Sequence, residues 1–240
     1  MGLEKILGSS KSSLLLLHPT SLPDPQGNKY GVGELGSEAF RFVDFLAEAG
    51  ILAWQVLPLG HTGYGNSPYQ TFSRFAGSPY MISVEKLLEK GDISQEEHDN
   101  YVKKVVTKDD NTDFGWLFDN KLGFNRDSEA VLRKAFKRFN EKKTERFDDF
   151  GKFCKEESYW LDDYAEFMGL KENNGQRHWE EWDARFRIVG LWKSKREEMI
   201  SADKNLKDSI QFYRYLQFVF FEQWNDLKSY SKTKGRKIIG

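Results

Sequence analysis

The stretch Trp54–Pro79, WQVLPLGHTGYGNSPYQTFSRFAGSP, decides how this 240-residue chain is interpreted. Its beginning belongs to an apolar segment, 53–59, that is typical of a short strand ending at Pro58-Leu59-Gly60. The rest is rich in glycine, which permits positive φ, and proline, which fixes φ, so we expect a loop of defined shape without helix or sheet. Its side chains are flat rings and short hydrogen-bonding groups with few Lys or Arg. That inventory suits an uncharged, hydroxyl-rich ligand better than a phosphate.

The same aromatic side chains also fit a purely structural loop. Aromatic residues at an arbitrary position are more often core than site. Under this alternative, rings such as Tyr69 fill a small satellite core and contact no ligand. Composition alone leaves both interpretations open.

The residues around the loop predict a strand–helix–strand unit. The compact apolar run Ser13–Leu17 predicts a buried strand. Residues 37–49 carry apolar side chains at helical spacing, with Ser37 as the expected N-cap and Gly50 at the end. Followed by the strand at 53–59, this order implies parallel pairing with a right-handed crossover.

The remainder of the chain predicts a long helical excursion and a third strand. Residues 98–205 are rich in charged side chains and carry apolar residues at helical spacing. A long helix is predicted from Leu206 to about Tyr230, and a strand is predicted to begin at Arg236–Ile239. We therefore expect an α/β fold that is the opening of a (β/α)8 or TIM-type barrel, incomplete because such a barrel needs eight strands. The expected parts are the start of the barrel at 1–80, a mainly helical insertion at 81–205 and a return to the barrel at 206–240.

Composition excludes several classes of partner. The chain has 36 basic and 37 acidic side chains, so it lacks the basic field expected of a protein that binds nucleic acid or an anionic membrane. The longest early apolar run, Leu14–Leu17, is too short for a signal peptide or a membrane span. The single cysteine, Cys154, excludes an internal disulfide and fits a reducing compartment. We expect a cytoplasmic protein.

No metal ion or organic cofactor is expected. Residues 31–36, GVGELG, fit the dinucleotide-binding pattern, but they do not follow the first strand directly, and the second strand does not end in a carboxylate. His98 and His178 lack partners at metal-ligand spacing. Adjacent acidic pairs on a helix point apart, so they do not form a converging pair of catalytic carboxylates by themselves.

Three motifs in order resemble the 4-alpha-glucanotransferases of glycoside hydrolase family 77, also called amylomaltases or disproportionating enzymes. They are LLHPTSLP at 16–23, YGVGELG at 30–36, and the quoted loop. The resemblance is strongest over residues 14–91. His61 stands where the family usually has proline, and Asn66 where aspartate is frequent.

The resemblance implies transfer of alpha-1,4-glucan segments between maltooligosaccharides by a retaining double displacement, on a chain substantially longer than this one. Such a reaction needs two carboxylates flanking the scissile bond. In the family both follow the third strand, so no catalytic residue is expected within this chain, and its expected partner is the missing C-terminal half of the barrel. The alternative function is that of a non-catalytic glucan-binding or regulatory module derived from the same family.

The resemblance also implies which residues bind substrate. Ser67 and Tyr69 match the positions that line the family's active cleft. Tyr64 matches a second glucan site, whose downstream tyrosine corresponds best to Phe118; phenylalanine keeps the stacking face and loses the hydroxyl. His18 joins these candidates because it follows the first strand, and β/α barrels carry function at the carboxyl ends of their strands.

Overall fold

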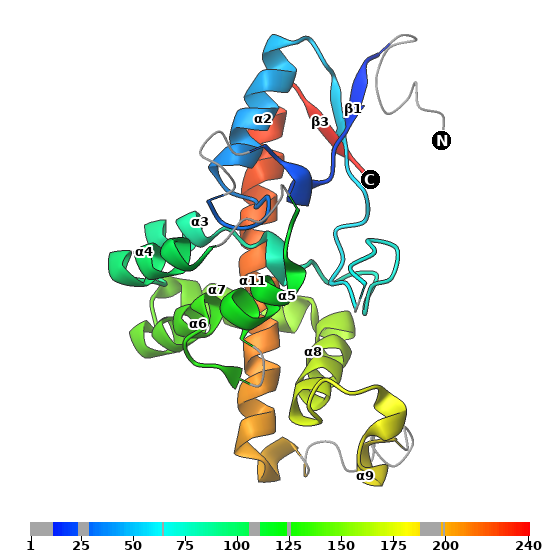
Figure 1. The fold of residues 1–240 in the computed structure, drawn as a ribbon, viewed down its shortest axis with the longest axis vertical. Helices are drawn as coiled ribbons and strands as arrows, with labels where there is room; N and C mark the ends of the chain where they lie inside the picture. Colours follow the sequence, from blue (N-terminus) through cyan, green and yellow to red (C-terminus); the bar gives the residue numbers. More distant parts are fainter. Residues whose placement is uncertain are drawn as a thin grey trace. The chain divides into compact units, whose positions relative to one another are not determined.

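The computed structural model describes residues 12–23, 29–63, 65–105, 111–123, 126–187, 198 and 200–240. They belong to two compact units (Figure 1). The sheet unit comprises Met1–Leu117 and Val219–Gly240, and the helical unit comprises Phe118–Phe218. Helix α11, Lys204–Thr233, contributes its first part to the helical unit and its second part to the sheet unit. Within the described ranges no helix has the length and apolar character needed to cross a bilayer.

The sheet unit is built on three parallel strands in the order β1-β2-β3, which confirms the predicted parallel pairing. The strands are β1 Leu14–Leu16, β2 Ala53–Gln55 and β3 Lys237–Ile239. In register, Trp54 of the central strand pairs with Leu15 on one side and Ile238 on the other. The strand predicted at 53–59 ends at Gln55, because the chain runs on to Pro58, which has no N–H to donate to a ladder.

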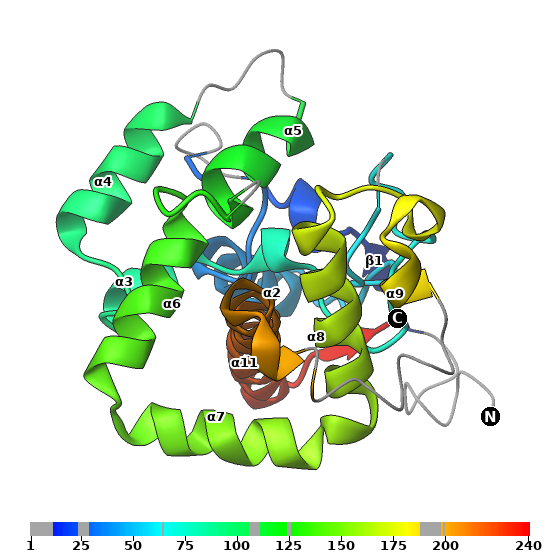
Figure 2. The ribbon, with the colours of Figure 1, turned by 90° about the horizontal axis from the view of Figure 1, so that it is seen from below.

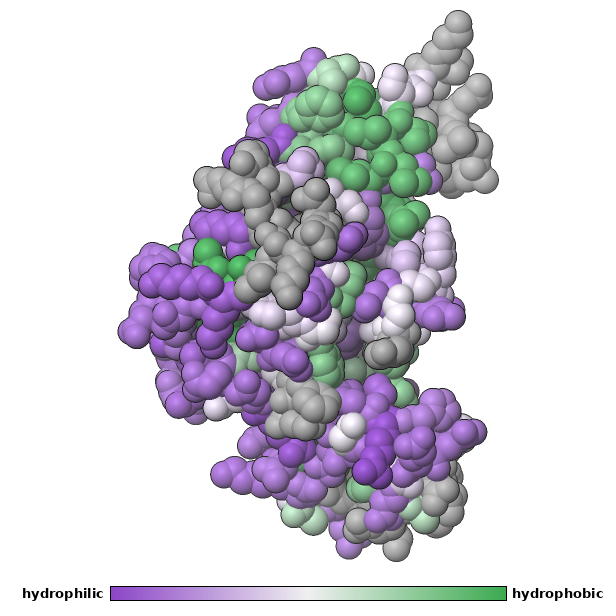
Figure 3. All heavy atoms as spheres, in the orientation of Figure 1, coloured by the Kyte–Doolittle hydropathy of each residue, from purple (hydrophilic) through white to green (hydrophobic). Residues whose placement is uncertain are grey.

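The prediction that the first strand is buried is wrong. Leu14, Leu15 and Leu16 are 39%, 36% and 51% exposed, whereas Trp54 of β2 is 0% exposed. The reason is position in the sheet: β1 is an edge strand and pairs only with β2, while β2 is paired on both sides. Figure 3 shows the resulting gathering of apolar atoms over the part of the sheet unit that carries the strands.

Helix α2, Ser37–Glu48, covers the sheet after β1 (Figure 1). Its Phe42 ring meets Trp54 edge-on, with 4.8 Å between centroids. The predicted N-cap is wrong by one residue, because Gly36 occupies the cap position without a side-chain hydrogen bond. The Ser37 N–H instead donates to the Glu85 carboxylate at 3.2 Å. A side chain of the neighbouring helix therefore satisfies one of the free backbone N–H groups at the start of α2. As predicted, the helix stops just before Gly50, which adopts φ +70° after the C-cap Ala49.

The second part of α11 leads into β3 and is tied to α2 and to the start of α3. Ser83 donates its backbone N–H to Gln223 Oε1 at 2.7 Å, and Tyr230 donates to the Asp44 carboxylate at 2.7 Å. Lys234 Nζ lies 2.6 Å from the same carboxylate.

The other described elements of the sheet unit are short helices. They are η1 Pro19–Ser21, η2 Pro79–Met81, α3 Val84–Glu89, α4 Gln95–Lys104 and α5 Phe114–Leu117.

The helical unit packs aromatic side chains around the first part of α11. Figure 2 shows α6, α7 and α8 arranged around that helix. Phe139 of α6 lies 5.0 Å from Tyr215, and Phe150 of α7 lies 5.6 Å from Phe218, between ring centroids. The elements are η3 Phe118–Leu122, α6 Val131–Lys142, α7 Glu145–Glu156, α8 Ser158–Asn173, η5 Trp179–Glu181, α9 Ala184–Arg187 and α11 up to Phe218.

Candidate functional site

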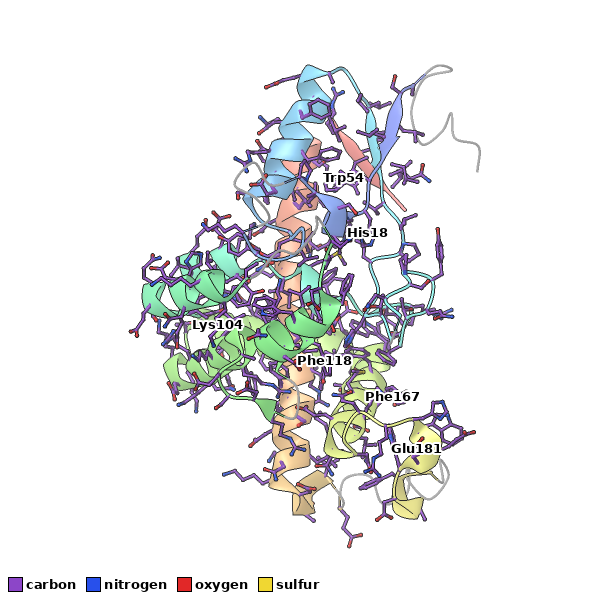
Figure 4. All side chains as sticks on the ribbon, viewed as in Figure 1. His18, Trp54, Lys104, Phe118, Phe167 and Glu181 are labelled. Carbon is purple, nitrogen blue, oxygen red and sulfur yellow. The ribbon has the colours of Figure 1, made fainter. Side chains whose placement is uncertain are left out.

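The segments that follow β1 and β2 leave the sheet at the same edge, because the two strands are parallel. His18 lies just beyond β1 (Figure 4), and its Nε2 is 3.4 Å from the Pro58 carbonyl beyond β2. The Trp54 indole N–H donates to the Leu17 carbonyl at 2.6 Å. These contacts bring the start of the LLHPTSLP motif against the start of the glycine-rich loop.

His18 uses both ring nitrogens within the protein. Its Nδ1 accepts from the Thr20 backbone N–H at 3.3 Å and lies 2.6 Å from Thr20 Oγ1. Because Nδ1 accepts a backbone N–H, the neutral ring carries its proton on Nε2, which faces Pro58 O. Burial lowers the pKa of His18 below its usual 6.5, and the hydrogen bond to Pro58 opposes that shift only in part. The neutral His18 ring therefore links the segments that follow β1 and β2 through its two hydrogen bonds; we call this link the His18 brace.

The glycine-rich loop has a defined shape without helix or sheet, as expected from the sequence, and its residues 59–78 without Tyr64 are called the ribbon here. Antiparallel bridges join Gly60 to Gly77 and Thr62 to Thr71. The Ser78 N–H donates to Leu59 O at 2.8 Å, and the Gly63 N–H donates to Gln70 O at 3.2 Å. The backbone hydrogen bonds therefore link the two sides of the ribbon.

The base of the ribbon is buried against the sheet unit. His61 is 2% exposed, and its ring meets Phe72 and Tyr80 edge-on at 5.3 and 6.3 Å. At Gly77 an added Cβ would lie 2.1 Å from ring atoms of Phe220 on α11. Only glycine permits this close approach without a shift of the ring. The base is therefore anchored by packing as well as by hydrogen bonds.

The tip of the ribbon, residues 66–70, is a tight turn that projects Tyr69 outward. The Gln70 N–H donates to Ser67 O at 3.0 Å, and the Tyr69 N–H donates to Ser67 Oγ at 3.4 Å. Asn66 enters the turn with φ +55°, a conformation that asparagine tolerates better than most residues. Tyr69 is 72% exposed, so it does not fill a core. Ser67 and Tyr69 are thus adjacent, and Tyr69 offers both a ring face and a hydroxyl to solvent.

One further aromatic residue of the ribbon went unnoticed in the sequence. Phe75 is 39% exposed, and the Arg74 guanidinium lies 4.7 Å from its ring centroid. The signal was present in the quoted stretch, where SRFAG follows SPYQTF. An exposed ring beside a planar cation is a second surface on which a sugar ring is able to pack.

The residues assigned to a second glucan site are described less completely. Tyr64 lies outside the described residues. Phe118 begins the π-helical turn η3 of the helical unit, where it is half-buried and its carbonyl accepts the Gly123 N–H at 3.0 Å. The pairing of Tyr64 with Phe118 stays a prediction. Among the described side chains, no group of three or more His, Cys, Asp or Glu is arranged to hold a metal ion.

Known proteins are similar to this chain in sequence and in structure. The 4-alpha-glucanotransferase of Thermus thermophilus is 42% identical over 94% of this chain and 41% of its own length, and that of Clostridium butyricum is 39% identical over 93% and 42%. The amylomaltase of Streptococcus agalactiae, solved in complex with acarbose, superposes with a TM-score of 0.79 at 36% identity, over 96% of this chain and 43% of its own.

The shared region accounts for nearly all of this chain but less than half of each relative. The chain spans 37–42% of the length of the curated relatives compared here. Residues 17–240 match the sequence profile of glycoside hydrolase family 77, described as 4-alpha-glucanotransferase. The profile begins at the end of β1 and includes the ribbon. The chain therefore belongs to the 4-alpha-glucanotransferase family.

Proposed function

We propose that the whole protein transfers alpha-1,4-glucan segments between maltooligosaccharides, and that this chain supplies a glucan-contacting surface. The observation that carries the proposal is the ribbon, whose anchored base presents Ser67 and an exposed Tyr69 beyond the carboxyl end of β2. Flat rings and neutral hydrogen-bonding groups suit sugar faces and hydroxyls. The S. agalactiae amylomaltase binds acarbose, which supports an α-glucan-like ligand for the fold.

The proposed architecture is the opening of a TIM-type barrel. The parallel order β1-β2-β3 and the helices before β2 and β3 support it. The apolar side chains exposed on β1 support a further layer or strand supplied by the rest of the barrel. In this proposal the start of the barrel is 1–80, the helical insertion is 81–205 and the return is 206–240, in a cytoplasmic enzyme without a metal or organic cofactor.

The catalytic carboxylates are proposed to lie outside this chain. Retaining transfer requires a nucleophile and an acid/base group on either side of the glycosidic bond. Within the chain, Ser67, Tyr69 and His18 bind or position, and none of them supplies a pair of carboxylates. Tyr64 and Phe118 are proposed to form the second glucan site.

Glucose release from maltotriose tests the proposal. We expect the whole protein to release glucose as it rearranges maltotriose, and the separately purified 240-residue chain to release none, because positioned acid/base and nucleophilic groups supply most of the rate. Saturable maltotriose binding by the whole protein without any turnover would instead support a non-catalytic glucan-binding module. Glucose release by the 240-residue chain that survives repeated purification would overturn the assignment of the carboxylates.

A further inference from the structure

The turn that follows α8 in the helical unit carries an exposed tryptophan. Trp179 begins η5 and is 47% exposed. Tryptophan is highly buried on average, because its ring carries a large apolar surface. Glu181, at the other end of the same short helix, is labelled in Figure 4. Residues 177–181 are all exposed, and we call them the Trp179 turn.

Buried contacts hold the Trp179 turn against α8. Trp182, just beyond the turn, is buried, and its ring centroid lies 5.4 Å from that of Phe167 on α8. The Arg177 carbonyl accepts the Trp182 indole N–H at 3.1 Å and Lys171 Nζ of α8 at 3.1 Å. The Trp182 backbone N–H donates to Trp179 O at 3.2 Å. Two tryptophans of one turn therefore differ in use: Trp182 anchors it, and Trp179 faces solvent.

The indole N–H of Trp179 is open to another molecule. Three other tryptophans use this group to donate a hydrogen bond within the protein. They are Trp54, Trp160 and Trp182. Trp179 makes no such bond to the residues that the structure describes, and the side chains of Arg177 and Glu181 form no ion pair with them. The turn therefore offers a ring, two donor groups and an acceptor that the described part of the protein leaves unused.

The neighbours of Trp179 select the class of molecule that fits this surface. A surface that docks another protein has an apolar core from which charged residues are depleted. Residues 177–181, RHWEE, contain one apolar side chain and four polar or charged ones. A carboxylate only accepts hydrogen bonds when ionised, and arginine only donates them. A neutral molecule with many hydroxyl groups satisfies both, because each hydroxyl donates and accepts, and a flat ring face completes a surface for a sugar.

We propose that the Trp179 turn is an accessory binding site for a maltooligosaccharide. The choice of an α-glucan rests on the function proposed above, whereas the neutral, hydroxyl-rich character of the ligand rests on the turn itself. The Trp179 ring packs against the face of a glucose unit, and its N–H donates to a sugar oxygen. His178, whose ring centroid lies 6.1 Å from that of Trp179, bonds a neighbouring hydroxyl. The site uses no residue of the ribbon.

The ¹⁹F NMR spectrum of the whole protein, labelled with 5-fluorotryptophan, tests this proposal. The signals of Trp179 and Trp160 are assigned by their loss in Trp179→Phe and Trp160→Phe. We expect maltotriose to shift the Trp179 signal saturably and to leave the signal of the buried Trp160 in place. Transfer between maltotriose molecules yields other maltooligosaccharides, so the class of ligand does not change during the titration.

His178→Ala should weaken the maltotriose binding reported by the Trp179 signal on the order of fivefold, as expected for the loss of one hydrogen bond. His178 is exposed and supports the turn through its carbonyl, which alanine retains, so the fold is expected to stay unchanged. Lys137→Ala is the matched control, because Lys137 is an exposed residue of α6 outside the turn. Tyr69→Ala should leave the shift intact, because Tyr69 belongs to the ribbon.

A Trp179 signal that does not respond to maltotriose, moves together with that of Trp160, or responds only when Tyr69 is present would overturn the accessory site. A signal insensitive both to maltotriose and to exchange of H₂O for D₂O would show that another part of the protein covers the ring, which would overturn it as well. Glucose release from maltotriose that persists in any of these cases would leave the proposed function standing. Absence of both glucose release and a Trp179 response would remove the support for both.

Discussion

The base and the tip of the ribbon belong to one short segment, yet they differ in almost every physical respect. The base places His61 at 2% exposure and Gly77 against the Phe220 ring, whereas the tip places Tyr69 at 72% exposure. Changes at the base therefore act on folding, and changes at the tip act on what the surface contacts. The difference shows how a loop without regular secondary structure presents an exposed side chain: packing at its base fixes the place from which the tip projects.

The largest effect is expected for Gly77→Ala at the base. The new Cβ would overlap the Phe220 ring, and overpacking of this kind costs about 1–3 kcal/mol of stability. Gly63→Ala is the matched control, because its Cβ would lie 3.6 Å from Phe72, an ordinary contact. Urea unfolding of the two variants measures the difference. Equal midpoints would contradict the anchoring role assigned to Gly77.

Substitutions of Tyr69 should come next and should change activity rather than stability. In the whole protein, Tyr69→Phe removes only a hydroxyl, which we expect to cost on the order of 1 kcal/mol, or several-fold in kcat/KM for maltotriose. Tyr69→Ala should cost more, because the packing face of the ring is lost as well. Steady-state kinetics and thermal unfolding of both variants are the measurements. Unchanged kinetics in a stable Tyr69→Ala protein would remove Tyr69 from the binding surface.

The neutral His18 ring predicts that the stability of the fold depends on pH, with an effect of intermediate size. Burial lowers the pKa of folded His18 below the 6.5 of the unfolded chain, so the unfolded state binds protons more readily. The contribution of the neutral ring to stability is complete above about pH 6.5. It is lost as the pH falls from there through the lower folded pKa.

The midpoints of urea-induced unfolding of the wild type and His18→Gln at about pH 7.5, 6.0 and 5.0 measure this effect. The glutamine still offers a donor to Pro58 O but does not titrate. We expect the wild type to lose more stability on acidification than the variant does, because titrations elsewhere are common to both proteins. Parallel profiles would show that His18 titrates alike in the folded and unfolded states.

The smallest effect is expected for Gln70→Ala at the tip. Gln70 is exposed, and the turn uses its backbone N–H and carbonyl, which alanine retains. Surface substitutions of this kind usually change stability by less than about 0.5 kcal/mol. Thermal unfolding alongside Gly77→Ala gives the comparison directly. A loss as large as that of Gly77→Ala would mean that base and tip unfold as one packed unit and that the distinction drawn here is mistaken.

Several features of this protein follow from the sequence by itself. Local patterns predicted the three strands, the second of them too long at its end, the helix that stops just before Gly50, and the family to which the chain belongs. These features depend on residues close together in the chain: runs of apolar residues, helical spacing, a glycine that adopts positive φ, and motifs of adjacent residues. Such signals do not require knowledge of what a segment packs against.

Other features depended on tertiary structure. The exposure of Leu14–Leu16 follows from the edge position of β1, and the cap of α2 comes from Glu85, which is distant in sequence. The ribbon's bridges and the contact of Gly77 with Phe220 join residues that sequence spacing does not relate. Burial and non-local hydrogen bonds are properties of the packed molecule, because they depend on which surfaces meet. The sequence therefore identified the segment that carries Tyr69, and only the fold decided that its ring faces outward.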